Sequence, residues 1–217
     1  MESVSVIAQA MRKGMWATSL DLVSGYNHLS INPKNWEILS FMFEDVTYMY
    51  TTLPFGLNIA PREFSKVVGA AVKILRMENI LLFFDLDDIL ILAPNRETSL
   101  RWTARTVELF QELGFIISAE KSVLTPTQRI EHLGVLFDLE VGKLVLTEKK
   151  VDKIRCMVKE FVQRKTVEIR TLAKLNRQII FATVAVPSQQ HSSGGYLANK
   201  GSGGFDQCFG DSCDRKS

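Results

Sequence analysis

Three carboxylates stand within four positions of an otherwise apolar run, and no other residues of the chain are better placed to do chemistry. The run 81–92 (LLFFDLDDILIL) sets Asp85, Asp87 and Asp88 between two apolar segments. This pattern predicts a buried β-hairpin with the acids near its turn. Burying an unpaired carboxylate is strongly unfavourable, and adjacent carboxylates raise each other's pKa unless a cation neutralises them.

Two interpretations of this acidic turn stay open on the local sequence. Aspartate is a common turn residue, so the acids could simply close a tight turn between two strands. Alternatively, they could form a divalent-metal site at the tip of the hairpin, because hard cations prefer carboxylate oxygens.

A fourth acid, Asp21, is the partner that a metal site would need. Residues 16–22 (WATSLDL) alternate loosely and predict a strand that closes on this acid. If that strand lies beside the acidic hairpin, Asp21 meets Asp87 and Asp88 at one edge of a sheet. Three carboxylates there could hold two divalent ions, which together clamp the attacking and leaving oxygens of a phosphoryl displacement.

The rest of the chain must supply the elements that position these acids. We expect two strands within 38–52 with Glu44-Asp45 as their turn, and a short strand at 115–117. Residues 130–138 and 143–146 predict a further hairpin with Gly142 at its turn. Helical spacing predicts helices from Pro61 onward, over 97–112, from Glu148 and over 167–181. The inward faces expected for the first two helices are Phe64, Val67, Val68, Ala71, Val72 and Leu75, and then Leu100, Ala104, Val107 and Phe110. This order predicts an α+β fold, an antiparallel sheet with helices on one face.

Composition narrows the class of protein. The 217 residues are 46% hydrophobic, enough for one domain with a real core, and no apolar run is long enough to cross a membrane. We therefore expect no membrane partner. The three cysteines, Cys156, Cys208 and Cys213, are odd in number and fit a reducing intracellular setting, cytoplasm or nucleus.

Charge is unevenly distributed along the chain. The net charge of the whole chain is +2, but residues 143–177 hold eleven basic and four acidic side chains, a net charge of +7. An acidic body with a basic C-terminal element suggests a cation site in one part and a polyanion contact in the other, although an ordinary solvated helix face is an equal alternative. Beyond Pro187 the sequence turns to Gly, Ser, Asn and Asp and predicts a disordered tail.

Four ordered blocks make the chain resemble the palm of reverse transcriptases, particularly those of retrotransposons of the gypsy or DIRS type. The blocks are 19–26 (SLDLVSGY), 53–64 (LPFGLNIAPREF), 86–90 (LDDIL) and 113–122 (LGFIISAEKS), the last followed by 132–134 (HLG). The resemblance implies RNA-directed DNA synthesis by two-metal nucleotidyl transfer. It implies a polymerase palm with a ferredoxin- or RRM-like antiparallel sheet and a partial helical thumb. The expected organisation is a palm with a remnant of the fingers over 1–146, a thumb-like segment over 147–186 and a disordered tail over 187–217.

The resemblance also implies roles for single residues. Asp21, Asp87 and Asp88 would bind two Mg²⁺ or Mn²⁺ ions, with the backbone carbonyl of Leu22 as an added ligand. Tyr26 would lie under the incoming sugar and exclude a 2′-hydroxyl, while Phe55 and Gly56 would line the pocket of the dNTP. The remaining implied roles are proton donation to the leaving pyrophosphate by Lys121 and a grip on the primer end by Leu133 and Gly134. The implied partners are an RNA or DNA template with its primer, dNTP, and the rest of a retroelement polyprotein.

The chain departs from the family at two places. The family usually has an aromatic residue where this chain has Asp85, which could add a ligand, face away or mark a damaged site. Only 20 residues precede Asp21, where the family carries a basic fingers region, so we expect an N-terminally truncated fragment. The alternative function is accordingly an inactive retroelement remnant that at most binds nucleic acid.

Overall fold

The computed structural model describes residues 2–163 and 167–183. The chain divides into two compact units after Thr147, and each unit is taken by itself below. The expected tail over 187–217, with Cys208 and Cys213, lies outside the described residues.

The first unit is built on a four-stranded antiparallel sheet, as the sequence predicts. Its strands are β1 (Trp16–Asp21), β4 (Leu82–Asp85), β5 (Asp88–Ala93) and β6 (Val123–Thr127). They lie in the order β4-β5-β1-β6, and helices α2 (Ala60–Met77) and α3 (Arg96–Glu112) connect β1 to β4 and β5 to β6. This βαββαβ arrangement confirms the predicted ferredoxin-like antiparallel sheet.

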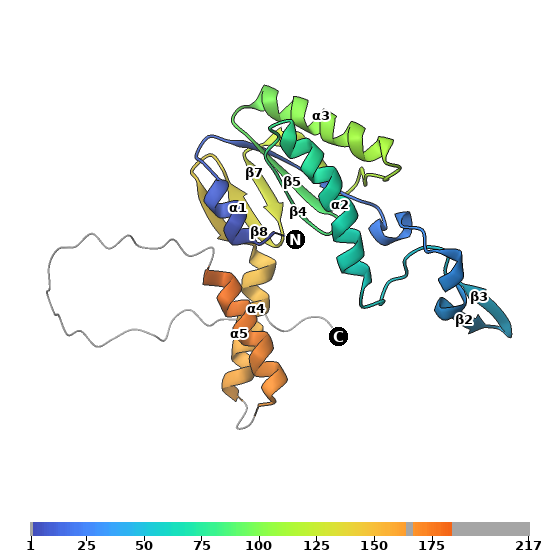
Figure 1. Ribbon diagram of the computed structural model, residues 1–217. Helices are drawn as coiled ribbons and strands as arrows, with labels where there is room; N and C mark the ends of the chain where they lie inside the picture. Colours follow the sequence, from blue (N-terminus) through green and yellow to red (C-terminus); the bar gives the residue numbers. More distant parts are fainter. Residues whose placement is uncertain (1, 164–166, 184–217) are drawn as a thin grey trace, which may run out of the picture. The chain divides into compact units, whose positions relative to one another are not determined.

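Both long helices cover the same face of the sheet (Figure 1). Phe64 and Leu75 of α2 and Phe110 of α3 pack with Ile89 of β5 in one core, and each is at most 1% exposed. The other predicted inward residues of α2 are buried except Val67, which is 42% exposed. Hydrophobic burial on one face therefore holds the sheet rigid behind the acidic turn.

The inward face of α3 differs from the prediction. Leu100 is 43% exposed and Ala104 is exposed, whereas Thr103 and Thr106 are buried. The hydroxyl of Thr103 donates to the carbonyl of Ser99 at 2.7 Å, and the Thr106 hydroxyl donates to Trp102 at 2.8 Å. Because these hydroxyls are satisfied within the helix, threonine can be buried at little cost. Apolar periodicity alone misplaced this face by about one residue.

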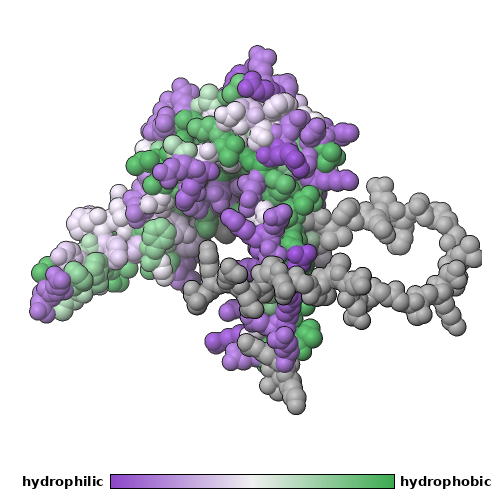
Figure 2. Space-filling view, turned by 180° about the vertical axis from the view of Figure 1, so that it is seen from behind, coloured by the Kyte–Doolittle hydropathy of each residue, from purple (hydrophilic) through white to green (hydrophobic). Residues whose placement is uncertain are grey.

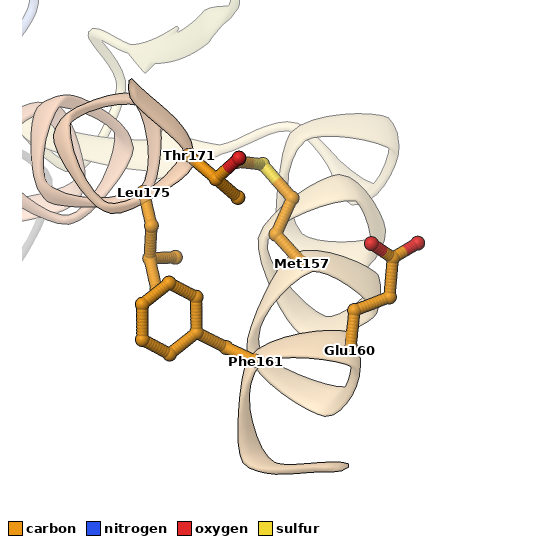
Figure 3. Close-up of a pocket in the computed structure, with 5 residues that line it drawn as sticks. All are labelled: Met157, Glu160, Phe161, Thr171 and Leu175. Carbon is orange, nitrogen blue, oxygen red and sulfur yellow. The ribbon is translucent and has the colours of Figure 1, made fainter. Parts of the chain in front are cut away.

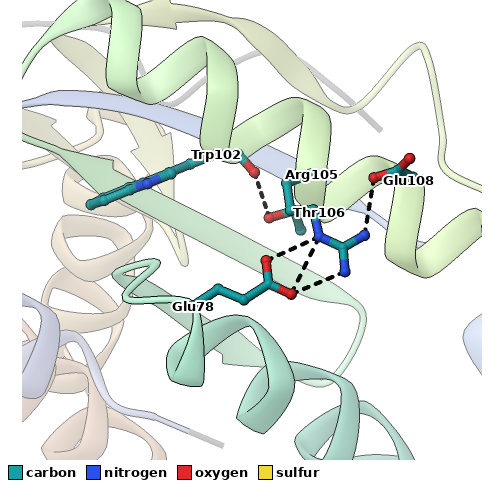
Figure 4. Close-up of polar contacts among 5 residues, drawn as sticks. All are labelled: Glu78, Trp102, Arg105, Thr106 and Glu108. Carbon is teal, nitrogen blue, oxygen red and sulfur yellow. Dashed lines mark hydrogen bonds and ion pairs between the residues drawn. The ribbon is translucent and has the colours of Figure 1, made fainter.

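An ion pair links the C-terminal end of α2 to the middle of α3. Arg105 of α3 donates to the carboxylate of Glu78 at 3.0 Å and to Glu108, one turn along its own helix, also at 3.0 Å (Figure 4). All three side chains are exposed to solvent by a third or more, so solvent screens these ion pairs and they add little to stability.

Glu2 protects the open edge of β4. Its amide donates to the carbonyl of Phe84 at 3.1 Å, and its carboxylate accepts from the Phe84 amide at 3.2 Å. Arg76 holds the same carboxylate at 2.7 Å. The following residues form α1 (Val4–Ala10), which buries Val4 and Ile7. Pairing of this kind blocks edge-to-edge association of the sheet.

The hairpin predicted over 130–146, with its turn at Gly142, is present as part of a second sheet. This sheet has three antiparallel strands, β7 (Arg129–His132), β8 (Val135–Asp138) and β9 (Lys143–Leu146), in that order. The predicted first strand folds back at Leu133 and Gly134, whose φ angles are +52° and +76°. The expected strand at 115–117 is only a bridge between Ile117 and Leu22, and β6 takes its place despite Pro126. Within the described sheet β6 pairs only with β1, and an edge strand tolerates proline.

The hairpin predicted within 38–52 is present but exposed. Strands β2 (Ser40–Phe43) and β3 (Val46–Met49) pair with each other and turn at Glu44-Asp45, both with positive φ. Every residue of the two strands is exposed, and Phe41 stacks on Tyr48. Figure 2 shows this hydrophobic arm at the lower left. The short 3₁₀ turns η1 (Gly25–His28), η2 (Pro33–Asn35) and η3 (Glu37–Leu39) join it to β1.

The second unit contains two helices, α4 (Glu148–Gln163) and α5 (Ile169–Thr183). Met157 and Phe161 of α4 face Thr171 and Leu175 of α5 across a cavity of about 60 Å³ (Figure 3). Lys150 places its ammonium 4.5 Å from the centre of the Phe181 ring. No helix among the described residues is long and apolar enough to span a membrane.

Candidate active site

The acidic hairpin is a tight turn between buried strands. Asp85 ends β4 and Asp88 begins β5, so Leu86 and Asp87 form a two-residue turn. Leu86 has a φ of +57°, a left-handed conformation that costs a branched side chain about 1 kcal/mol or more. The flanking residues of both strands are buried, which over-determines the turn and holds it in this shape.

Register brings three of the four acids into one row. Asp88 lies directly opposite Asp21 of β1 on one side and opposite Asp85 of β4 on the other. Directly opposed residues of antiparallel strands share a face of the sheet. The row is therefore Asp21, Asp88 and Asp85, and Asp87 projects from the turn. This register places Asp85 on the same face of the sheet as Asp88.

Asp87 lies on the other side of the hairpin. It lines a cavity of about 60 Å³ with Tyr26 and Phe55, whereas Asp21 and Asp88 line a second cavity of about 380 Å³. The carbonyl of Asp87 accepts a hydrogen bond from the Leu22 amide at 3.0 Å. The acids therefore stand at the junction of two cavities, and the backbone next to Asp21 is tied to the turn.

Asp21 is fixed by residues of the segment between α3 and β6. Its amide donates to the Ser122 hydroxyl at 3.0 Å, and its carbonyl accepts from the Ser118 amide at 2.8 Å. Lys121, which is 70% exposed, places its ammonium 3.4 Å from Asp21 Oδ1. This ion pair lacks hydrogen-bond geometry, so the buried Oδ1 has no hydrogen-bond donor among the residues that the structure describes.

The closely placed carboxylates of the row change the pKa of Asp88. Burial raises its pKa to about 6, with further increases from Asp87, Asp21 and Asp85 that Lys121 partly offsets. A carboxyl whose pKa is raised in the fold binds its proton more tightly there than in the unfolded chain. The contribution of Asp88 to stability is therefore full below pH 3.8 and is lost as the pH rises through about 6.

We expect Asp88→Asn to be more stable than the wild type at pH 7 and equally stable at pH 3.5. Because Asp88 is partly solvated, its raised pKa overstates the effect, and we expect the free energy of unfolding to rise by about 1–2 kcal/mol at pH 7. Urea unfolding of both proteins in a chelating buffer from pH 3.5 to 7.5 measures it. Parallel pH profiles of the two proteins would contradict the electrostatic account.

The carboxylate oxygens of these acids are suitable ligands for a hard divalent cation, but their side chains do not form a ligand cluster within the part of the chain that the structure describes. They are oxygen donors of the type that Mg²⁺ prefers, and the buried Oδ1 of Asp21 lacks a hydrogen-bond donor. Within residues 2–163 and 167–183, however, no three His, Cys, Asp or Glu side chains lie close enough together to hold a metal ion. Asp87 lines one cavity, and Asp21 and Asp88 line the other.

Aromatic rings form the wall of the Asp87 cavity. The ring of Tyr26 meets Phe64 edge-on at 5.3 Å and Phe55 at 5.1 Å. Burial, and then the charge of Asp87, raise the pKa of the Tyr26 phenol, so it stays protonated at physiological pH. Phe55 is 67% exposed, and Gly56 follows it with a φ of +90° that favours glycine. Tyr26 and Phe55 are thus brought together as the sequence suggests.

Gly25 is a residue of this wall that sequence reasoning did not select. A Cβ atom there would lie 2.5 Å from Cζ of Phe64, closer than any carbon contact allows. We expect Gly25→Ala to lose about 1–3 kcal/mol of stability, with a displaced Tyr26. Gly69→Ala in α2 is the matched control, since its Cβ would meet Phe84 at 3.6 Å and alanine favours the helix. Thermal unfolding of both variants compares them, and equal melting temperatures would contradict the steric argument.

His28 connects two loops by hydrogen bonds, a structural role that the sequence did not indicate. Its Nε2 accepts from the Ile116 amide at 3.2 Å, and its Nδ1 lies 3.2 Å from the Gly25 carbonyl. Because a carbonyl only accepts, Nδ1 is the protonated nitrogen. His28 therefore locks the loop that carries Tyr26 onto the segment after α3.

The larger cavity collects the residues predicted to grip a primer. Leu133 and Gly134 of the β7–β8 turn line it together with Lys121, His132 and Ser19. Residues up to 115 positions apart in sequence, Ser19 and Gly134, thus meet at one site. Both expected sets of residues flank the acidic turn.

Comparison with known proteins agrees with this geometry. The family model described as "Reverse transcriptase (RNA-dependent DNA polymerase)" matches residues 1–137, more than half of the chain. Protein P of duck hepatitis B virus (isolate brown Shanghai duck S5) is 27% identical over 161 residues, 73% of this chain and 20% of that protein. The enzymatic polyprotein of Cestrum yellow leaf curling virus is 28% identical over 175 residues, 80% of this chain and 26% of that protein. The chain thus spans about a fifth to a quarter of the length of these relatives.

Solved structures match the fold. The foamy viral protease-reverse transcriptase in complex with double-stranded DNA superposes with a TM-score of 0.67 and 20% identity, covering 84% of this chain and 30% of that one. The same kind of protein in complex with an RNA/DNA hybrid gives a TM-score of 0.65 and 21% identity, covering 84% of this chain and 23% of that one.

Proposed function

The chain belongs to the reverse transcriptase family, and from that premise we propose that it carries the palm of an RNA-directed DNA polymerase, which adds deoxynucleotides to a primer. The observation that carries the proposal is the position of Asp21, Asp87 and Asp88 at one sheet edge between two cavities. The aromatic rings beside Asp87 suit contact with the sugar of a nucleotide, and the larger polar cavity on the other side suits the end of a primer strand.

The proposed division of labour follows from the two cavities. The dNTP enters beside Tyr26 and Phe55, and the Tyr26 ring lies where the sugar would rest, so a 2′-hydroxyl would collide with it. Gly56 keeps the backbone close to the template. The primer end lies against Leu133 and Gly134, which brings its 3′-hydroxyl toward the acidic turn.

Asp21, Asp87 and Asp88 are the residues that would hold two Mg²⁺ or Mn²⁺ ions, with the Leu22 carbonyl as an added ligand. When bound, such ions lower the pKa of the attacking hydroxyl and stabilise charge on the transferring phosphoryl group. The carboxylates fix where this charge stabilisation acts, because β1 and the β4–β5 turn hold them in register.

Lys121 is proposed to protonate the leaving pyrophosphate. Its side chain is 70% exposed and its ammonium lies 3.4 Å from Asp21 Oδ1, so it can move toward a nucleotide bound at the acidic turn without leaving a buried position. A proton donor at this point would assist departure of the pyrophosphate oxygen.

The second unit is proposed as a thumb segment that contacts the duplex backbone. Of its two helices, α4 carries five lysine and arginine residues and α5 three, and such side chains bind phosphates without reading the sequence. The structural neighbours bound to double-stranded DNA and to an RNA/DNA hybrid support nucleic acid as the partner. On the wording of blocks 53–64 and 113–122 we further propose an origin in a gypsy- or DIRS-type retrotransposon polyprotein that acts inside the cell.

Primer extension tests the proposal. The full chain is incubated with an RNA template, a labelled DNA primer, dNTP and Mg²⁺ or Mn²⁺, beside the Asp87→Asn variant. Incorporation by the wild type alone supports polymerase activity, and equal incorporation by both proteins sinks it.

The basic helices favour one second candidate, a non-catalytic nucleic-acid binder. In that case the duplex binds with an affinity that falls steeply with salt, and neither protein extends the primer. An affinity insensitive to ionic strength would argue against phosphate contact.

A further inference from the structure

The hydrophobic arm formed by β2 and β3 has no part in the function proposed above. Among the described residues these two strands pair only with each other, and every residue of both is exposed (Figure 2). An isolated two-stranded hairpin is only marginally stable in water, and exposed strands with apolar side chains tend to associate with other chains. The arm is therefore a surface that would gain stability from a partner.

One face of the arm is aromatic. Phe41 lies directly opposite Tyr48, and Phe43 lies opposite Val46, so the members of each pair share a face. Strand alternation adds Tyr50, whose ring centre lies 5.1 Å from that of Phe41, and Phe41 also stacks on Tyr48 at 5.6 Å. The opposite face carries Ser40, Met42, Thr47 and Met49. Because the rings support one another, the aromatic face is preformed and loses little freedom when it binds.

The charge of the arm and its base argues against nucleic acid as the partner. Residues 29–52 contain one basic residue, Lys34, and three acidic residues, Glu37, Glu44 and Asp45, a net charge of −2. Sites that stack the bases of a single strand combine aromatic rings with a positively charged groove. Since this segment is acidic, it repels phosphates, and the aromatic face suits an uncharged apolar surface of a protein.

A second copy of the chain offers such a surface. A two-fold axis that crosses the strands at a right angle sets the two aromatic faces against each other with the arms antiparallel. The Glu44-Asp45 turns then lie at opposite ends of the interface, where their carboxylates do not repel one another. An axis along the strands would instead bring all four carboxylates together, so charge selects the antiparallel arrangement.

The exposed area of the aromatic face suits a weak dimer. The five side chains of this face are each between 43% and 58% exposed. At about 200 Å² for each large side chain, the face offers roughly 500 Å² from each copy, or about 1,000 Å² in all. Specific interfaces begin at about this total area, and those of this size are weak or transient. We therefore expect dissociation in the micromolar range.

We propose that the chain forms a two-fold dimer in which the aromatic faces of two antiparallel arms pack together. Phe41, Phe43 and Tyr48 of one copy then contact the same residues of the other copy. The dimer does not depend on the polymerase function proposed above, because the arm includes none of the acids at the acidic turn.

Sedimentation velocity of the full chain tests the proposal. The protein is treated with nuclease and measured from about 1 to 200 µM, a range that covers a micromolar dissociation constant. We expect a monomer at the lowest concentration and a dimer at the highest. The dimer should persist when NaCl is raised from about 0.1 to 0.5 M, because salt screens charges and leaves apolar contacts intact.

Two neighbouring substitutions identify the face that binds. Phe43 and Met42 are adjacent in β2, lie on opposite faces, and are 58% and 71% exposed. We expect Phe43→Ser to weaken the dimer about a hundredfold, since about tenfold is lost from each of the two copies. Met42→Ser removes a more exposed side chain from the other face and should leave the dissociation constant within about twofold of the wild type.

The folding of the variants is checked by thermal unfolding at the lowest concentration. Since Phe43 is more than half exposed in the single chain, Phe43→Ser should melt within a few degrees of the wild type. If Phe43→Ser unfolds, Val46→Thr replaces it, because threonine has the shape of valine and suits a strand, and a loss of about tenfold is expected.

Four results would each overturn the proposal. They are a monomer at every concentration, a dimer that Met42→Ser weakens as much as Phe43→Ser, a dimer that dissociates at the higher salt, and assemblies that keep growing with concentration. The third would indicate a partner held by charge, and the fourth an open-ended contact, because a two-fold interface closes at two copies.

Discussion

Asp87→Asn is expected to lose primer extension by about a thousandfold or more, which corresponds to about 4 kcal/mol of transition-state stabilisation. Asp87 projects from the two-residue turn into the cavity of Tyr26 and Phe55, the side proposed for the incoming nucleotide. Asparagine keeps the size and one oxygen but removes the charge that a divalent ion requires. Single-turnover extension of a labelled primer at saturating dNTP measures the loss.

Asp85→Asn is the matched control for this prediction. It removes one negative charge from the same hairpin, and Asp85 lies opposite Asp88 in the register of β4 and β5. We expect the Asp85→Asn variant to keep activity within about tenfold of the wild type. The charge of Asp85 acts on Asp88, whose pKa it raises, and the variant removes only this effect. A loss as deep as that of Asp87→Asn would mean that Asp85 is itself a ligand or that total charge matters more than the single carboxylate.

Tyr26→Val is expected to reduce discrimination between deoxynucleotides and ribonucleotides by about a hundredfold. The Tyr26 ring is held by edge contact with Phe64 and by Phe55, so it cannot turn aside for a 2′-hydroxyl without disturbing the core. Valine removes the part of the ring that would collide. The ratio of kcat/KM for dNTP and the matching NTP measures selectivity.

Tyr26→Phe separates the ring from its hydroxyl. It should discriminate nearly as well as the wild type, because the proposed clash comes from the ring. Undiminished selectivity in Tyr26→Val would place the sugar elsewhere and contradict the assigned side of the nucleotide. Selectivity lost in Tyr26→Phe would instead assign the discrimination to the phenol.

Much of the fold was predictable because it depends on local patterns. The acidic turn, the Glu44-Asp45 turn and α2 follow from short-range rules of alternation, helical period and turn chemistry. The sequence left open whether β1 lies beside the acidic hairpin. The structure pairs β1 with β5 and sets Asp21 opposite Asp88.

The prediction failed at positions whose burial or pairing is decided by the tertiary structure. The inner face of α3 was misplaced because threonine hydroxyls can be satisfied within a helix and then buried. Strand β6 was missed because proline is acceptable on an edge, and edge position is a property of the sheet. The break of the predicted strand at Leu133 depends on two left-handed residues, of which only Gly134 is recognisable from its type.

The sequence by itself determined which residues are chemical. Carboxylates beside apolar strands are costly to bury, so the sequence marks Asp87 and Asp88 as either turn residues or ligands of a cation, with Asp21 as a candidate third ligand. Only the tertiary structure decided which of these acids share a face of the sheet and which cavity each of them lines. Cross-strand register sets Asp85 and not Asp87 in the row with Asp21 and Asp88, and it separates the two cavities on either side of the turn. It also buries His132 beside that row, because β7 and β1 meet only when segments more than 100 residues apart fold together.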